Sequence, residues 1–357
     1  MAAGTKIPEV PQLGASCPLP LTAHDHIMLG HGSGGKLSAQ LLERVFLPAF
    51  TNPILERLDD QAVVEINSSR LAFTTDAFVV TPLFFPGGDI GHLAVNGTVN
   101  DLAMSGARPL YLAATFILEE GLPMAELRRV VESMREAAGN AGVQLVAGDT
   151  KVVNRGKADK LFISTTGIGV LDKPVTLSAD RARPGDKIIL SGYIGDHGMA
   201  ILCQRENLEF EGAIESDCAA LHGLVADMLD ASLDIHCLRD PTRGGLATVL
   251  NEIAGRSKVS IQFDETEIPV HNSIRGACEI LGLDPLYVAN EGKLVAIVGR
   301  DSADAIVARM RQNPLGAQAR IIGEVMAEHP GMVVMRTEIG GTRVLDTLFG
   351  EQLPRIC

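Results

Sequence analysis

The last residue of the chain, Cys357, places a thiol at the end of a segment that lacks a clear helix or strand pattern. Residues 340–350 contain three glycines and are weakly patterned, as in a mobile tail. Pro354 keeps the final residues out of a helix or a central strand. The sequence therefore predicts a thiol on a tether that can enter a pocket and leave it again. The alternative is an incidental surface cysteine.

Acidic residues lie at the ends of several predicted elements, where ligand groups gather in α/β folds. Mg²⁺ takes hard oxygen ligands in octahedral geometry, so a set of carboxylates of this kind could hold a metal–triphosphate. Each acid alone is typical of a solvated turn, and only the set points to an ATP site. We expect the metal ligands to be Asp59, Asp76, Asp101 and Asp149, with Asp60 and Glu291 beside them.

A glycine-rich loop at residues 30–36 matches most of the phosphate-binding pattern Gly-x-x-x-x-Gly-Lys-[Ser/Thr]. Leu37 stands at the final position, so the hydroxyl that would hold Mg²⁺ is missing. Backbone N–H groups of such a loop, together with a lysine, can still wrap phosphates. The alternative is a flexible loop before a helix. The predicted phosphate-binding residues are Gly32, Gly34, Gly35 and Lys36.

Other candidate ligands lie in the first half of the chain. Asn96 and Asn100 share one face of a predicted buried helix, where polar side chains need partners. They form either an internal hydrogen-bond network or a face toward a metal-bound ligand, with Asn100 and Asp101 contacting the nucleotide. Asp149 and Thr150 follow an aliphatic strand and are expected to bind ATP at its end. In the second half, residues 240–245 open a helix whose N–H groups could face an anion or be capped in the ordinary way.

The element pattern predicts an α/β (α+β) protein of two domains, since 357 residues are enough for two cores. The expected domains are residues 29–172 and 173–338, preceded by a disordered Pro-rich lead-in at 1–28 and followed by a mobile tail at 339–357. Helices are expected at 37–46, 89–105, 124–138, 199–205, 218–231, 246–254, 272–281 and 303–311. Strands are expected at 62–66, 71–75, 110–117, 143–147, 161–170, 187–191, 259–263, 294–298 and 319–323.

Composition excludes several classes of protein. The net charge of −13 argues against nucleic-acid binding and against docking on an anionic membrane. No apolar run approaches transmembrane length, and the first residues do not read as a secretory signal. The six cysteines are scattered without a Cys-x-x-Cys pair, which argues against a zinc ribbon and indicates a reducing cytoplasm.

These motifs together resemble the HypE family of hydrogenase maturation factors, within the aminoimidazole-ribonucleotide-synthetase-like ATPase superfamily. The acidic motifs are shared across the superfamily, whereas the terminal Pro-Arg-Ile-Cys is specific to this family. The resemblance runs from the glycine loop to the end of the chain. It is carried by residues 30–36, 74–76, 84–91, 100–104, 148–151, 240–246, 290–293 and 354–357.

The resemblance implies that two chains form a homodimer, in which the N-terminal domains pair into a barrel and the ATP clefts lie beside the interface. It also implies a carrier role for Cys357. The carbamoyltransferase HypF would load a carbamoyl group onto this thiol, and the protein would dehydrate it with ATP and Mg²⁺ to a thiocyanate. A HypC–HypD complex would receive the cyanide for the iron of NiFe hydrogenase. Glu291 is the expected base, with Lys151 as its partner.

Three alternatives remain open at this point. A selenophosphate synthetase would need a reactive cysteine or selenocysteine in the glycine loop, and residues 30–36 contain none. A thiamine-monophosphate kinase would not need the terminal cysteine. A non-catalytic carrier could bind the nucleotide only for structure, and ATP turnover would separate it from an enzyme.

Overall fold

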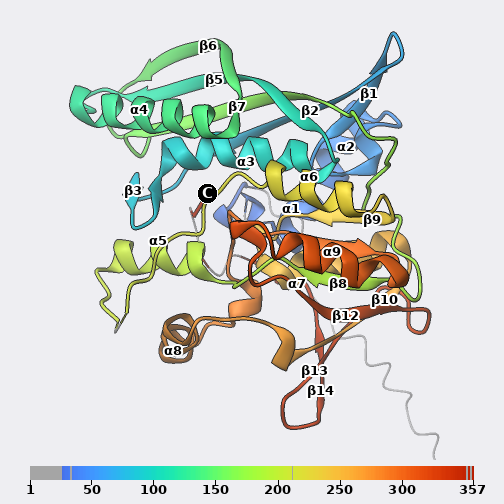
Figure 1. Cartoon of the computed structure of the whole chain (residues 1–357). Coiled ribbons are helices and arrows are strands. Elements are labelled where there is room, and N and C mark those ends of the chain that lie inside the picture. Colours follow the sequence, from blue (N-terminus) through green and yellow to red (C-terminus); the bar gives the residue numbers. More distant parts are fainter. Residues whose placement is uncertain (1–25, 33, 211, 351–352, 354–355) are drawn as a thin grey trace, which may run out of the picture.

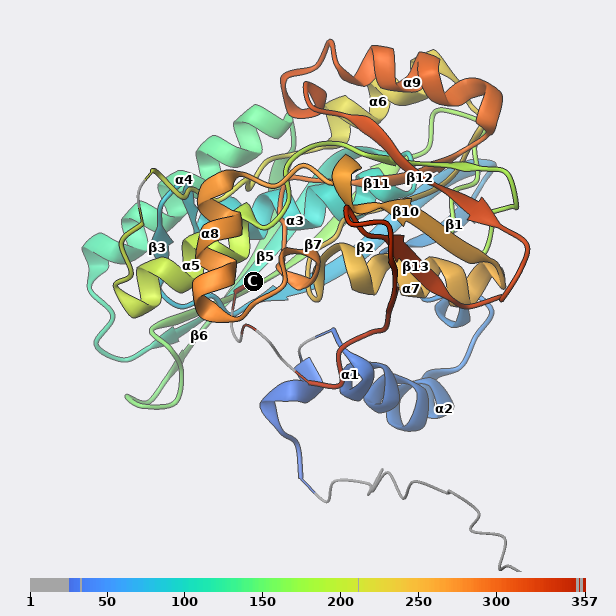
Figure 2. The same ribbon diagram turned by 90° about the horizontal axis from the view of Figure 1, so that it is seen from below.

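The computed structural model describes residues 26–32, 34–210, 212–350, 353, 356 and 357. Two β-sheets organise this part of the chain, one in each half of the sequence (Figure 1). The predicted two-domain α/β architecture is therefore confirmed. The end of the chain lies between the two halves in Figure 1 and near α5 and α8 in Figure 2. The predicted lead-in, except for residues 26–28, lies outside the described residues.

The N-terminal sheet has the strand order β1-β2-β7-β5-β6 within the described residues, and only the β5–β6 pair is parallel. Helices α3 and α4 cover one of its faces (Figure 1). Helix α3 is apolar nearly all round and is buried, as its sequence predicts. The elements are β1 (Ala62–Ile66), β2 (Ser69–Phe78), β3 (Phe84–Phe85), β4 (Gly88–Asp89), α3 (Ile90–Met104), β5 (Arg108–Glu119), α4 (Met124–Ala141), β6 (Gln144–Val153) and β7 (Leu161–Val170).

The other face of the N-terminal sheet carries large apolar side chains that are open to solvent. Phe73, Ile168 and Tyr111 face each other across β2, β7 and β5. Each is more than a third exposed in the single chain: 45%, 39% and 46% respectively. An apolar row on an uncovered sheet face is typical of a protein–protein contact.

The C-terminal sheet has the strand order β14-β13-β10-β12-β8-β11-β9 within the described residues. Its aliphatic strands are buried between helices, which gives this half a core of its own. The elements are β8 (Lys187–Leu190), α5 (Asp196–Glu206), α6 (His222–Ala231), β9 (Ile235–Arg239), α7 (Gly245–Ser257), β10 (Ser260–Asp264), α8 (Asn272–Leu281), β11 (Val295–Val298), α9 (Ala303–Met310), β12 (Arg320–Met326), β13 (Val333–Arg336) and β14 (Thr342–Leu345).

The glycine loop precedes a helical segment, as expected, but this segment is longer than predicted. Helix α1 (Lys36–Leu41) continues through a π-helical stretch into α2 (Leu47–Phe50). The N–H of Lys36 donates to the carbonyl of Leu348 over 2.9 Å, so the loop packs against the start of the terminal segment. No helix in the described part of the chain is long and apolar enough to cross a membrane.

Three predicted boundaries are wrong in ways that affect the site. Strand β6 continues through residues 148–151 to Val153, because its edge pairs with β5 along the whole length. The expected tail at 339–357 contains strand β14, which forms a hairpin with β13. Helix α6 starts at His222 instead of 218, since the backbone of residues 219–221 bonds to Asn100 on α3.

Candidate functional site

The described residues include a cavity of about 220 Å³ with an acidic lining, which we call the acidic pocket. It contains one arginine, from the turn before α7, and the terminal cysteine. The lining residues are Asp60, Thr75, Asp76, Gly97, Asp101, Asp240, Thr242, Arg243, Glu291 and Cys357.

The five side-chain carboxylates of the acidic pocket come from separate parts of the chain. Asp76 lies on β2, on the face that packs against α3, and Asp101 lies on α3 itself. The Thr74 hydroxyl donates to Asp101 over 2.7 Å and thereby fixes its orientation. Asp60 precedes β1, and Asp240 directly follows β9. The packing of the helix on the sheet therefore brings together acids that are far apart in sequence.

Burial and mutual repulsion disfavour ionisation of these acids. Burial, opposed by Arg239, raises the pKa of Asp60 to about 8, and burial raises the pKa of Asp240 to about 6. Burial and the charge of Asp240 raise the pKa of Asp101 well above its ordinary value. Burial raises the pKa of Asp76, and the charge of Arg243 offsets part of this increase. A cation that pairs with these carboxylates would offset their mutual repulsion and stabilise their ionised forms.

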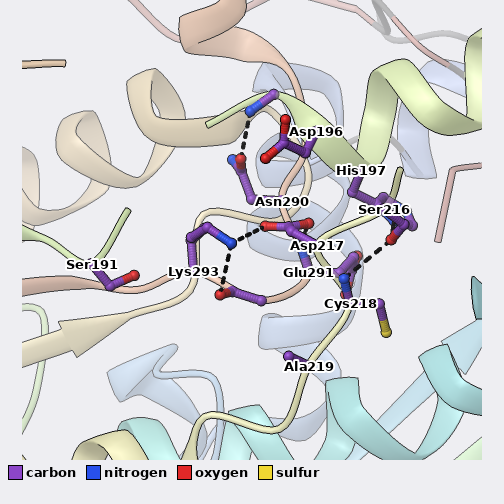
Figure 3. Close-up of polar contacts among 12 residues, drawn as sticks. Ser191, Asp196, His197, Ser216, Asp217, Cys218, Ala219, Asn290, Glu291 and Lys293 are labelled. Atoms are coloured by element: carbon purple, nitrogen blue, oxygen red, sulfur yellow. Dashed lines mark hydrogen bonds and ion pairs between the residues drawn. The ribbon is translucent and has the colours of Figure 1, made fainter. Parts of the chain in front are cut away.

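Glu291 is buried at the acidic pocket, and its Oε1 atom has no hydrogen-bond partner among the residues that the structure describes. Burial and the charge of Asp240 raise the pKa of its carboxyl. Its backbone is held on both sides: its N–H donates to Asp217 over 3.0 Å, and its carbonyl accepts from Asn100 over 3.1 Å. Figure 3 shows Glu291 beside Asp217 and Cys218. The backbone at Glu291 is therefore fixed, and one oxygen of its buried side chain is available to a ligand or a proton.

Cys357 reaches the acidic pocket because the end of the chain is docked in the protein. Leu353 and Ile356 are buried in the core that surrounds α3. The backbone N–H of Val79 donates to the terminal carboxylate over 3.1 Å. The charge of Cys357 is the main cause of the raised pKa of Arg243. The structure thus places the thiol among the acids, where the sequence analysis predicted a carrier cysteine to act.

A second cavity, of about 290 Å³, shares Arg243 and Cys357 with the acidic pocket, and we call it the glycine-loop pocket. Gly32 and Gly35 line it. A Cβ at Gly34 would lie 2.8 Å from the Cβ of Arg243, so only glycine allows the loop to approach this closely. The predicted phosphate-binding loop and the acids therefore border one connected site.

Three predicted ligands have other partners in the single chain. The ammonium group of Lys36 pairs with Asp346 over 2.6 Å. The Asp59 carboxylate accepts from Ser178 over 3.0 Å and holds the connection between the two halves. The Asn100 amide is engaged by the backbone of residues 219–221 and 291, which supports the alternative of an internal hydrogen-bond network.

Asp149, Thr150 and Lys151 are not brought to the acidic pocket within one chain. They lie on exposed strand β6, where the Lys151 ammonium pairs with Asp149 over 2.9 Å. This ion pair lowers the pKa of Asp149. By strand register, Asp149 and Lys151 lie on the uncovered face of the sheet, together with Tyr111. Any role for them at the site requires another chain.

Sequence reasoning missed Asp240 and Arg243 as individual site residues. The sequence predicted a helix start at their motif, with its backbone N–H groups, and not these two side chains, as the groups that bind a ligand. The available signal was the pair of opposite charges three residues apart before two glycines. The Arg243 guanidinium donates to the carbonyl of Gly32 over 2.9 Å, which links the helix start to the glycine loop.

Both halves of the chain match family models. The AIR synthase related protein N-terminal domain matches residues 58–171, and the corresponding C-terminal domain matches residues 183–335. The first range contains the whole N-terminal sheet, and the second contains the C-terminal sheet except for the last residue of β13 and strand β14. The match confirms the predicted superfamily fold.

Curated and solved relatives are similar over nearly the whole chain. The carbamoyl dehydratase HypE of Cupriavidus necator is 56% identical over 97% of this chain and 99% of its own length. A crystal structure of HypE in complex with ATP has a TM-score of 0.79 and 53% identity, covering 93% of this chain and all of that one. A HypE–HypF complex has a TM-score of 0.82 and 48% identity, covering 86% and 99%.

Proposed function

This chain belongs to the HypE family, and on that basis we propose that it is an ATP-dependent carbamoyl dehydratase that acts on its own C-terminus. The carbamoyl group is carried on the sulfur of Cys357, and the product is a protein thiocyanate that supplies the cyanide ligand of NiFe hydrogenase. The observation that carries the proposal is the position of Cys357 in the acidic pocket, beside the buried base Glu291. A non-catalytic carrier would have no use for this juxtaposition.

The reaction requires that an amide oxygen becomes a leaving group. Transfer of the ATP γ-phosphoryl group to the carbamoyl oxygen achieves this, and the oxygen then departs within inorganic phosphate. The carbamoyl nitrogen loses one proton, which passes to solvent, when its oxygen is phosphorylated, and it loses the second as phosphate departs and the C≡N bond forms. The carboxylate of Glu291 is the group that accepts a proton, and its burial makes the ionised form a stronger base.

The residues of the acidic pocket fit Mg²⁺. Within the described part of the chain, one buried carboxylate oxygen at each of Asp60 and Glu291 has no hydrogen-bond partner, and the carboxylates of the pocket offer the hard oxygen ligands that Mg²⁺ prefers. The described residues contain no group of three His, Cys, Asp or Glu side chains that could hold a metal ion alone. Since Mg²⁺ usually binds through one or two carboxylates plus substrate phosphates, we expect it to arrive with the nucleotide. When bound, it neutralises charge on the transferring phosphoryl group. Asp76 and Asp101 are the expected ligands.

The glycine-loop pocket is the proposed site for the rest of the nucleotide. Gly32 and Gly35 supply backbone groups at its wall, Gly34 packs against Arg243, and Arg243 spans both cavities. Lys36 has to exchange Asp346 for a phosphate to take part, which is feasible because both side chains are exposed. Asp60 lies deeper, where its ion pair with Arg239 orders the wall of the acidic pocket.

A homodimer completes the site. The uncovered apolar row of Phe73, Tyr111 and Ile168 needs a partner surface, and β6 is an unpaired edge within the described sheet. Pairing of two such faces into a barrel would bury both features. Asp149 and Lys151 lie on that face, and Thr150 lies between them on the same edge strand. All three would serve the partner's nucleotide, so Lys151 assists Glu291 of the other chain.

Transfer of groups to and from Cys357 requires partner proteins. The carbamoyltransferase HypF loads the thiol, and a HypC–HypD complex receives the cyanide in the cytoplasm. The tail has to leave the acidic pocket for both encounters. This movement requires release of Leu353 and Ile356, the buried side chains among the described residues 353, 356 and 357.

The proposal is tested by weighing the intact protein. The chain is incubated with HypF, carbamoyl phosphate and ATP, and its mass is followed with time. We expect a carbamoyl adduct on Cys357 that loses one water only when Mg²⁺ and ATP are present. A carbamoyl adduct that persists despite ATP hydrolysis would contradict the proposal.

A further inference from the structure

The docked chain end is bonded to the first turn of α5. The Nε2 atom of His197 lies 2.6 Å from the carbonyl oxygen of Ile356. Because a carbonyl oxygen only accepts hydrogen bonds, Nε2 carries the proton and donates it. Leu353 packs at the same turn, where a Cβ at Gly198 would lie 3.2 Å from its Cδ1 atom. This turn therefore holds the tail through one polar contact and one apolar contact.

The second ring nitrogen of His197 fixes the tautomer. Nδ1 lies 2.8 Å from the Ser216 hydroxyl, which accepts from the N–H of Cys218 over 3.1 Å (Figure 3). In a neutral ring with the proton on Nε2, Nδ1 accepts from this hydroxyl. The ring is fully buried, and burial lowers the pKa of His197. Phe85 packs edge-on with its centroid 5.6 Å away, so the ring is also fixed in orientation.

The segment that orients His197 also holds the proposed base. Asp217 lies between Ser216 and Cys218 in sequence, and its carboxylate accepts from the N–H of Glu291. Its other oxygen accepts from the Lys293 ammonium over 3.1 Å. Residues 216–218 thus connect the tail contact with the Glu291 loop.

We propose that His197 is the positioning residue that docks the loaded tail and thereby holds the thiol-borne group beside Glu291. Two contacts then flank Cys357, one from His197 to the preceding carbonyl and one from the Val79 N–H to the terminal carboxylate. These two contacts hold the backbone on both sides of the Cys357 side chain. The role of this docking in dehydration rests on the proposed function, whereas the hydrogen bond between His197 and the Ile356 carbonyl does not.

Two substitutions separate the hydrogen bond from the bulk of the ring. His197→Phe keeps an aromatic ring of similar size and removes both nitrogens. His197→Gln keeps an N–H group near the position of Nε2. His222→Phe makes the aromatic change at a partly buried histidine on α6 and serves as the matched control.

The first measurement is the rate at which iodoacetamide alkylates Cys357 in the full-length protein without nucleotide, followed by peptide mass. The second is the rate of the first dehydration turnover of carbamoylated protein at saturating ATP, together with the KM for ATP. Loss of one buried hydrogen bond is expected to raise alkylation about tenfold and to lower the first-turnover rate about tenfold in His197→Phe. The KM for ATP stays within about twofold, and His197→Gln recovers most of both rates.

Unchanged alkylation in His197→Phe would overturn the proposal, as would a His197→Gln variant as impaired as His197→Phe. If His197→Phe does not fold, Ser216→Ala replaces it, with an expected rise in alkylation of about threefold, and no rise would overturn the proposal. Alkylation needs no turnover. A wild-type protein that fails to dehydrate its carbamoyl group would therefore reject the proposed function, while the alkylation rates would still decide the role of His197.

Discussion

Asp149 and Asp76 lie on opposite faces of one sheet, with two strands between the strands that carry them. Three inter-strand spacings separate them by about 14 Å along the sheet, and the sheet itself lies between their side chains. One chain therefore cannot place Asp149 or its neighbour Lys151 beside the acids of the acidic pocket. In the proposed dimer, the second chain would supply Asp149 and Lys151 to the acidic pocket of the first.

Mixed dimers test whether Lys151 acts on the partner's site. Lys151→Ala and Glu291→Gln chains are each expected to be inactive alone. In a mixed dimer, one site combines Glu291 of one chain with Lys151 of the other, so random mixing should restore about one quarter of wild-type dehydration. The activity is measured after exchange of subunits. Mixtures as inactive as the parents would mean that both residues act from one chain or that no exchange occurs, and native mass spectrometry of the mixture distinguishes these outcomes.

Substitution of the proposed base should slow dehydration of the carbamoyl group without slowing carbamoylation of Cys357. Glu291→Gln keeps the shape of the side chain but cannot accept the proton, so the first-turnover dehydration rate should fall at least about a hundredfold. Carbamoylation of Cys357 by HypF and binding of ATP should stay close to wild type. The rates are read from intact mass, and wild-type dehydration by this variant would remove Glu291 from the mechanism.

Removal of one pocket carboxylate should stabilise the metal-free protein and weaken nucleotide binding. Asp101 is buried among like charges, so Asp101→Asn relieves repulsion and should raise the metal-free Tm by a few degrees. The same variant should lose most of the Tm increase that Mg²⁺ with ATP gives the wild type. Thermal denaturation with and without EDTA measures both effects. A lower metal-free Tm together with an intact response to Mg²⁺ and ATP would be the opposite result.

The buried pair of Asp217 and Lys293 supports the Glu291 loop, and its loss should cost stability. Both side chains are largely buried, so Asp217→Ala leaves an uncompensated ammonium and should lower the free energy of unfolding by about 3 kcal/mol. The exposed pair of Arg108 and Asp172 provides the matched control, and Asp172→Ala should change stability by less than about 1 kcal/mol. Urea denaturation compares the two variants, and equal effects would mean that the buried pair has no special role.

Asp196 gives a pH dependence with a defined sign. It is partly buried near Asp217, and burial raises its pKa to about 6. The charges of His271 and Lys293 oppose the shift. Since the folded pKa exceeds the unfolded one, the protonated carboxyl favours the folded state, and this contribution is complete below about pH 4 and lost above about pH 6. Asp196→Asn should therefore stabilise the protein by on the order of 2 kcal/mol at about pH 7.5 and leave it unchanged at about pH 4. Urea denaturation at both pH values measures this, and an equal effect at both would contradict it.

The sequence predicted most of the fold because hydrophobic periodicity marks buried faces directly. The amphipathic helix expected at 124–138 and the aliphatic strand expected at 161–170 are present, the helix three residues longer. Strand β6 was cut short at 147 because Gly148 and Asp149 are typical turn residues. They occur inside an exposed edge strand, where no core demands an apolar side chain.

Site residues that belong to a sequence motif could be predicted, whereas contacts that arise only from tertiary packing could not. Cys357, Asp76, Asp101 and Glu291 converge, as the resemblance to the HypE family implies. His197 stood in a recognised glycine-rich stretch, but the contact of its ring with a carbonyl 159 residues away leaves no local signal. Asn100 was expected at the ligand, whereas packing of α3 against residues 219–221 uses its amide for the backbone.

The fate of the carbamoyl oxygen tests the central claim most directly. The thiol of Cys357 is loaded with a carbamoyl group that contains a heavy oxygen isotope, and unlabelled ATP and Mg²⁺ are then added for one turnover. We predict that the isotope appears in inorganic phosphate, in amounts equal to the thiocyanate formed on Cys357. Label released as bicarbonate or retained on the protein would contradict dehydration in the acidic pocket, as would thiocyanate supplied by a chain that lacks Cys357.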